Sequence, residues 1–176
     1  MRLDKFTIKA QEALAAAQAE AEKHAHQEVT PEHVLRALLT QDEGVALAVL
    51  RKVGADPEGL LRKVDEALAA QPQVHGATAE AYVGRRMKDL LDEAARQSDE
   101  FKDEYVSSEH LLLGMVAKDV GDASRILREA GVRRDDLLKA LAEVRGNQRV
   151  TDPDAEQRYQ ALVKYTRDLT DLARKG

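Results

Sequence analysis

The chain has 176 residues and a net charge of −5. It is long enough for one ordinary domain plus a short tail, and its charge disfavours nonspecific nucleic-acid binding, which needs clustered cations against phosphate. It contains no cysteine, which excludes disulfides and thiolate chemistry, and it has neither an apolar run of membrane-spanning length nor a signal-peptide pattern. Aromatic residues make up only 3% of the chain, which favours an aliphatic helical core over a β-sandwich.

Apolar residues at helical spacing predict four helices in the first part of the chain. The predicted helices are residues 6–24, a stretch that begins at Thr30, residues 45–53, and a stretch that Asp56 and Pro57 open. The first of them has an apolar face made mostly of alanine, so a neighbouring element can approach it closely. Gly54 suits the end of the third helix, because glycine accepts the positive φ of a C-terminal cap. Residues 71–78 break the helical pattern.

The same spacing predicts four more helices after this break. They cover residues 80–101, 107–117, 122–130 and 133–144. Polar residues 146–153 then predict a linker, and residues 154–175 return to helical spacing. Nothing else in the chain needs this last helix, so we expect it to be mobile or partly disordered. We therefore predict a domain at residues 1–145 and a linker at 146–176.

The second set of helices repeats the first. Residues 29–35 recur 77 positions further on as residues 106–112, and both copies contain a Glu-His pair. Laying residues 6–67 on 83–144 gives roughly 15 identities in about 62 positions. The sequence therefore predicts an all-α fold, a pseudo-twofold tandem repeat of two four-helix units at about residues 6–70 and 83–145.

Each copy of the repeated segment predicts a helix start. Thr30 and Ser107 suit the N-cap, and Glu32 and Glu109 bring negative charge to the positive end of the helix dipole. The two helix starts would lie at related places along the seam between the repeats. Their acidic residues, Glu32 and Glu109, would give a groove at this seam a negatively charged rim. Such a groove suits an extended or helical apolar peptide flanked by Lys or Arg. A fully packed seam is the alternative.

No motif in the sequence predicts an enzyme active site. There is no P-loop, no dinucleotide-binding glycine pattern and no nucleophile elbow. The two Glu-His pairs could suggest acid–base chemistry, but adjacent helical residues do not face each other, so capping and packing explain the pairs better. His24 and His26 are expected on the solvated surface rather than in a metal site.

Several stretches resemble a known family. Residues 1–7, 10–14, 31–35 (Pro-Glu-His-Val-Leu) and 108–112 (Ser-Glu-His-Leu-Leu) resemble the doubled N-terminal domain of Clp unfoldases. Residues 149–153 (Arg-Val-Thr-Asp-Pro), 159–162 and 164–170 resemble the ClpB disaggregases in particular. The repeat alone is shared with the protease-linked ClpA and ClpC, so the tail is what selects ClpB.

The resemblance implies the N-terminal, substrate-recognition domain of a ring-shaped hexamer. The full protein would use ATP and Mg²⁺ in AAA+ domains beyond this chain to thread aggregated polypeptides, working with the DnaK chaperone system in the cytoplasm. This chain would by itself be monomeric, without a cofactor or catalytic residues. It would bind exposed apolar segments of unfolded polypeptides, and neither nucleic acid nor a membrane.

The family's peptide-binding groove can be carried to matching positions. Thr7, Asp103 and Glu109 would supply polar contacts, while Leu91 and His110 would line an apolar floor beside Tyr105. At the position of His110 some relatives have an aliphatic residue. Two other functions stay open at this point: an adaptor-docking domain of a ClpA- or ClpC-type unfoldase, and a self-contained helical enzyme.

Overall fold

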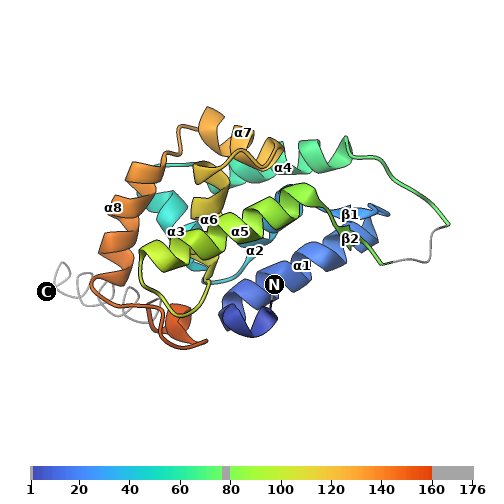
Figure 1. The fold of residues 1–176 in the computed structure, drawn as a ribbon. Helices are drawn as coiled ribbons and strands as arrows, with labels where there is room; N and C mark the ends of the chain where they lie inside the picture. Colours follow the sequence, from blue (N-terminus) through green and yellow to red (C-terminus); the bar gives the residue numbers. More distant parts are fainter. Residues whose placement is uncertain (1, 77–79, 160–176) are drawn as a thin grey trace, which may run out of the picture.

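The computed structural model describes residues 2–76 and 80–159 as a helical body (Figure 1). A short 3-10 helix at Leu3–Lys5 comes first, and two strands, β1 (Glu28–Val29) and β2 (Tyr82–Val83), accompany the helices. The α-helices are α1 (Ile8–Lys23), α2 (Pro31–Thr40), α3 (Val45–Lys52), α4 (Pro57–Ala69), α5 (Arg85–Glu100), α6 (Ser108–Ala117), α7 (Asp122–Glu129) and α8 (Arg134–Arg145). The all-α prediction is confirmed, and each repeat contributes four of these helices. Within the described residues, no helix has the length and hydropathy needed to span a membrane.

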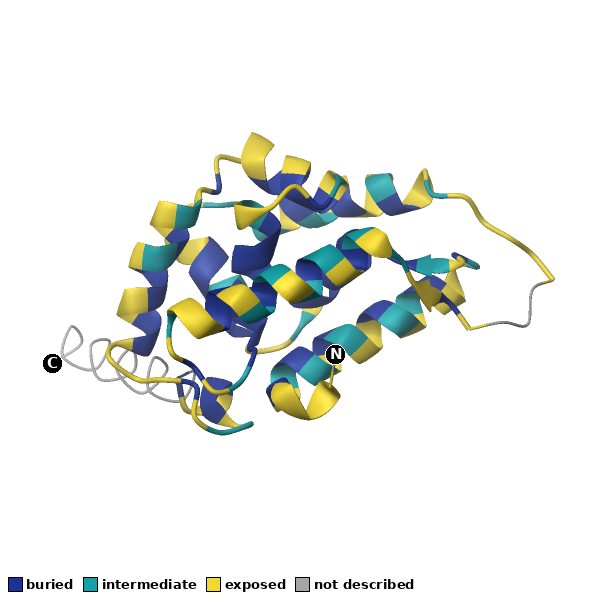
Figure 2. Cartoon of the chain, in the orientation of Figure 1, coloured by how far each residue is buried: buried dark blue, intermediate teal, exposed yellow. Residues whose placement is uncertain are grey.

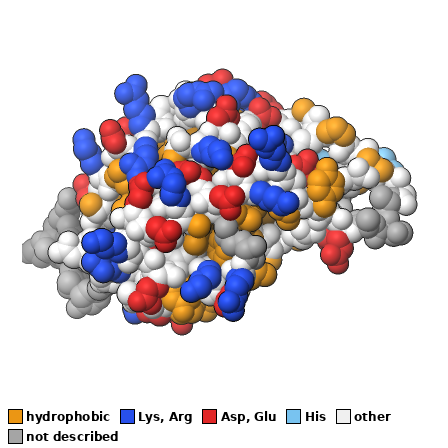
Figure 3. All heavy atoms as spheres, viewed as in Figure 1, with side chains coloured by type: hydrophobic (Ala, Val, Ile, Leu, Met, Phe, Trp, Pro, Cys, Tyr) orange, Lys and Arg blue, Asp and Glu red, His pale blue; other side chains and the backbone are white. Residues whose placement is uncertain are grey.

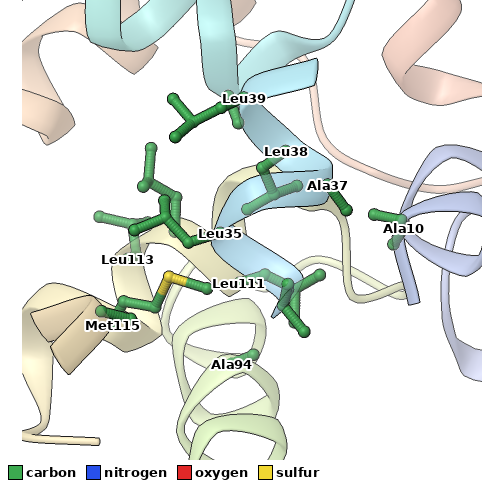
Figure 4. Close-up of a cluster of buried hydrophobic side chains, with 14 of the residues drawn as sticks. Ala10, Leu35, Ala37, Leu38, Leu39, Ala94, Leu111, Leu113 and Met115 are labelled. Carbon is green, nitrogen blue, oxygen red and sulfur yellow. The ribbon is translucent and has the colours of Figure 1, made fainter. Parts of the chain in front are cut away.

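The packing follows the predicted pseudo-twofold repeat. Helix α3 of the first repeat packs against α8 of the second, and α4 reciprocally packs against α7. The central helices α2 and α6 are buried almost throughout, and their leucine side chains meet in the core (Figures 2 and 4). Neither four-helix unit could bury this surface alone, so the two repeats form one hydrophobic core.

Two short backbone pairings join the repeats, and the sequence analysis missed both. Strand β1 pairs in parallel with β2, so that Val29 lies opposite Val83. At the equivalent place in the other repeat, Phe6 forms a parallel bridge with Val106. Because the segment before α5 is engaged in this pairing, α5 begins at Arg85 rather than at the predicted residue 80. A two-residue strand leaves no alternating pattern in a sequence, so periodicity could not find it.

The repeated helix starts are capping boxes in which histidine takes the place of the usual Glu or Gln. The Thr30 N–H donates to Nδ1 of His33 at 3.0 Å, and the Ser107 N–H donates to Nδ1 of His110 at 2.8 Å. This confirms that the Glu-His pairs serve capping and packing. Gly54 has a φ of 82°, as its predicted role at the end of α3 requires.

The beginning of the predicted linker packs onto the domain. Val150, Ala155, Glu156 and Tyr159 are all buried, and Val150, Ala155 and Tyr159 belong to the main core cluster. Residues 146–176 were predicted to be a linker whose helix at 154–175 nothing else in the chain needs, but residues 150–159 instead complete the core next to α1 and α6. The rest of the predicted helix at 154–175 lies outside the described residues.

Candidate functional site

An apolar groove lies between α1 and α5, with a volume of about 910 Å³. The two helices run alongside each other in Figure 1, and hydrophobic side chains gather between them on the face drawn in Figure 3. The lining comprises Leu3, Gln11, Glu12, Leu14, Ala15, Gln18, Val29, Val83, Met87, Lys88, Leu91 and Asp92. The predicted seam is therefore open on this face.

The groove sits where the repeat brings equivalent residues together. Leu14 of α1 and Leu91 of α5 occupy matching positions in the two repeats, and both are partly buried against the core. At the ends of the groove, Leu3 is 60% exposed and Val83 is 46% exposed, so apolar surface continues onto the margins. Exposed apolar patches of this kind on a folded domain mark interaction sites.

Charged residues at the groove are few and mixed. Glu12 and Asp92 are acidic, and Lys88 is basic. The amide of Gln18 is held by the backbone carbonyl of Ala81 at 3.1 Å. The prediction that Glu32 and Glu109 form a negative rim is wrong, because both side chains are fully buried. Glu32 instead joins the two repeats: it accepts hydrogen bonds from Arg86 at 2.9 Å and from the Ala123 N–H at 3.2 Å.

The residues carried over from the family separate into two places. Leu91 lines the groove. Thr7, Asp103, Glu109 and His110 are buried and do not line it, and Tyr105 is half-buried against the core. In this structure Thr7 contacts Glu156, Asp103 contacts His110 and Arg145, and Glu109 lies near Arg145. Their role as direct peptide contacts stays a prediction.

The buried polar cluster is centred on Arg145 and Asp103. Asp103 accepts hydrogen bonds from Arg145 at 2.7 Å and from the Val150 N–H at 2.9 Å, and its second oxygen lies 2.8 Å from Nε2 of His110. Burial opposes ionisation, but these hydrogen bonds outweigh it and hold the pKa of Asp103 below its usual range. Arg145 Nη1 also lies 3.6 Å from the Glu109 carboxylate.

Glu156 completes this cluster from the linker side. Its carboxylate accepts from the Ser108 N–H at 3.0 Å, from the Ser108 hydroxyl at 2.6 Å, and from the Thr7 hydroxyl. Burial and the neighbouring charge of Glu109 raise the pKa of Glu156 to about 7, although the hydrogen bonds act in the opposite direction.

Neither Arg145 nor Glu156 was predicted as a site residue. Both lie at or beyond the predicted end of the domain, where polar residues with Gly and Pro indicated a linker. The available signal was the pair of apolar residues Val150 and Tyr159, which a solvated linker would not need. Among the described residues, no three His, Cys, Asp or Glu side chains form a group that could hold a metal ion.

The first repeat carries a histidine pair where the second carries the His110–Asp103 pair. His33 Nε2 lies 2.9 Å from Nδ1 of His26, a residue that is buried rather than on the solvated surface as predicted. Burial and the neighbouring His26 lower the pKa of His33 to about 4. His33 is therefore neutral at pH 7, as its acceptor role in the capping box requires.

This lowered pKa predicts a loss of stability in mild acid. A histidine with a lowered folded pKa contributes stability that is complete above its unfolded pKa of about 6.5 and is lost as the pH falls toward 4. Relative to His33→Gln, which keeps a capping acceptor, the wild type should lose about 2 kcal/mol of unfolding free energy between pH 7.5 and pH 5. Urea unfolding at both pH values measures this difference. An identical pH dependence in the two proteins would contradict the assignment.

Comparison with known proteins places this geometry in context. The family described as the Clp repeat N-terminal domain matches residues 5–130. The chaperone protein ClpB of Bacillus cereus (strain ATCC 14579) is 38% identical over 179 residues, which cover 100% of this chain and 21% of that protein. The chaperone protein ClpB of Rhodopirellula baltica is 40% identical over 175 residues, which cover 99% of this chain and 20% of that protein. The chain thus spans about a fifth of the length of these relatives.

Solved structures share the fold. The N-terminal domain of Hsp104 from Candida albicans superposes with a TM-score of 0.74 at 24% identity, over 86% of this chain and 99% of that one. The ClpV N-domain in complex with a VipB peptide gives a TM-score of 0.63 at 24% identity, over 78% of this chain and 85% of that one. At these identities the likeness shows the common fold alone.

Proposed function

The chain belongs to the family of Clp repeat N-terminal domains, and we propose that it is the substrate-recognition domain of a ClpB-type disaggregase. In this proposal it captures exposed apolar segments of unfolded or aggregated polypeptides in the groove between α1 and α5. The observation that carries the proposal is the open apolar groove around Leu14 and Leu91. The curated relatives are chaperones, and a ClpV N-domain of the same fold has been solved with a peptide.

The chemistry of the groove suits weak and unselective capture. A leucine-lined surface gains free energy from any apolar side chain it shields, on the order of 1–2 kcal/mol each. Few polar groups are available to select one sequence over another, and the charges of Glu12, Lys88 and Asp92 are mixed. Weak binding suits a domain that must release its substrate onward.

The rest of the proposal concerns the full-length protein. Its AAA+ domains would bind ATP and Mg²⁺, assemble a homohexamer and draw the captured segment through the central pore, in cooperation with the DnaK system in the cytoplasm. Six copies of this domain around one pore would raise the local concentration of binding sites. This chain would contribute recognition and no catalytic step.

The affinity of the 176-residue chain for a separate, unfolded polypeptide tests the proposal. A fluorescently labelled polypeptide, kept unfolded by reduction and carboxymethylation, should raise its anisotropy when titrated with the 176-residue chain. The same polypeptide in its folded, disulfide-bonded form should not bind. An adaptor-docking domain would leave the unfolded polypeptide unbound while binding a folded partner, and that result would contradict the proposal.

A further inference from the structure

We infer that Thr7, Ser108 and Asp103 form a docking site for the chain's own segment 150–159, hereafter the exit segment, with Glu156 as its anchor. The site lies apart from the groove, since none of these residues lines it. It fixes the path by which the chain leaves the repeat domain. These polar residues would then position the segment by which the chain leaves the domain, and they would not contact a peptide bound in the groove.

The anchor contact is specific in its geometry. All three hydrogen bonds to the Glu156 carboxylate come from Thr7 and Ser108, at the N-terminal ends of α1 and α6. Thr7 also accepts from the Ala10 N–H at 3.2 Å as the N-cap of α1. One side chain from the exit segment thus bridges the first helix of one repeat and the second helix of the other. The positive end of the α6 dipole favours a carboxylate there.

Backbone hydrogen bonds also hold the part of the exit segment that precedes Glu156. The Glu104 N–H donates to the Val150 carbonyl at 2.8 Å, and the Ile8 N–H donates to the Pro153 carbonyl at 3.0 Å. The Val150 N–H donates to Asp103 at 2.9 Å. Tyr159 is fully buried, and the Arg145 guanidinium lies 5.7 Å from its ring centroid. The segment is therefore held by polar and apolar contacts together.

The duplication provides an internal comparison. The residues equivalent to Ser108 and Thr7 in the opposite repeat are Pro31 and Gly84. Proline has no N–H and neither residue has a hydroxyl, so the equivalent place cannot donate the three hydrogen bonds that Glu156 receives. Only one of the two related helix starts thus carries these three donors, and that one holds the exit segment.

Charge sets the pH range of docking. Glu109 from α6 is the charged neighbour that acts on Glu156. Glu109 belongs to the same buried cluster as Arg145 from α8, Asp103, His110 and Tyr159 of the exit segment. The pKa of Glu156 is raised to about 7 when docked, so the docked state holds a proton that a free glutamate releases near pH 4.5. Docking is therefore tightest below about pH 4.5 and weakens as the pH rises from there to about 7.

Amide hydrogen exchange of the 176-residue chain tests the inference. Glu156→Ala should speed exchange of the amides in residues 150–159 by about tenfold or more, because the segment loses its anchor. Glu156→Gln can keep all three hydrogen bonds by donating to the Ser108 hydroxyl, so its exchange should stay within about threefold of wild type. Asp154→Ala, an exposed acid in the same segment, is the matched control and should have no effect.

Two further measurements make the test decisive. Ser108→Ala removes one donor to Glu156 without changing the segment, and it should also speed exchange at 150–159 while the amides of α3 and α4 stay protected. The affinity of Glu156→Ala for unfolded polypeptide should stay within about twofold of wild type, since the groove is untouched. Unchanged exchange in Glu156→Ala, or an equal rise in every helix, would overturn the inference. A loss of polypeptide binding in a folded Glu156→Ala chain would overturn it as well.

Discussion

Arg145→Met is expected to lower the free energy of unfolding by about 3–5 kcal/mol, because it removes the cation from a buried cluster of acids. Arg145 is itself buried, and it contacts Asp103 at 2.7 Å and Glu109 at 3.6 Å. Methionine fills much of the same volume, so the loss comes mainly from uncompensated charge rather than from a cavity. Asp103 would keep its contact with His110, but Glu109 would have no cation near it.

Chemical denaturation of the variant and of a matched control measures this loss. Arg125 makes two ion pairs on the surface, with Asp122 and Glu129, and is 44% exposed. Arg125→Met should therefore cost far less stability than Arg145→Met. The cost of Arg145→Met should shrink as the pH falls below 5, where the bare carboxylates take up protons. Equal losses in the two variants, or a loss that does not depend on pH, would show that the buried charge cluster is not what Arg145 stabilises.

Leu91→Glu is expected to reduce affinity for unfolded polypeptide by at least about tenfold, because an apolar ligand would have to bury an ionised carboxylate. Leu91 lies in the groove beside its repeat equivalent Leu14, and no basic residue other than Lys88 lines that surface. The residue is only partly buried, so the folded chain can turn a glutamate toward solvent. Helical content should therefore stay close to that of the wild type.

Val74→Glu is the control for this variant. Val74 is also an exposed apolar residue, at 39%, and it lies outside the groove. Anisotropy titration should give wild-type affinity for Val74→Glu and weak or no binding for Leu91→Glu. Should both variants bind equally well, the groove would not be the binding surface.

The helices and their duplication could be predicted from the sequence because both leave periodic signals. Leu14 and Leu91 match across the repeat, and the repeat itself predicts a seam between two helical units. The core of a helical repeat depends mainly on such local patterns, so helix order and number followed directly.

The burial of charged groups could not be predicted in this way. Glu32 and Glu109 resemble ordinary acids in the first turn of a helix, which are usually solvated. Glu32 is buried because the opposite repeat covers its helix start with Arg86 and α7, whereas Arg145, at the end of the same repeat, lies beside Glu109. The contact between Thr7 and Glu156 joins residues 149 positions apart, and no local pattern reports a contact of that separation.

The most direct test of the proposed function is an NMR titration of the methyl-labelled chain with the unfolded polypeptide. The account predicts that the methyl signals of Leu14, Met87 and Leu91 shift progressively, while those of Leu60 and Leu137, in the core away from the groove, do not. No shift at saturating polypeptide, or shifts confined to residues outside the groove, would contradict it.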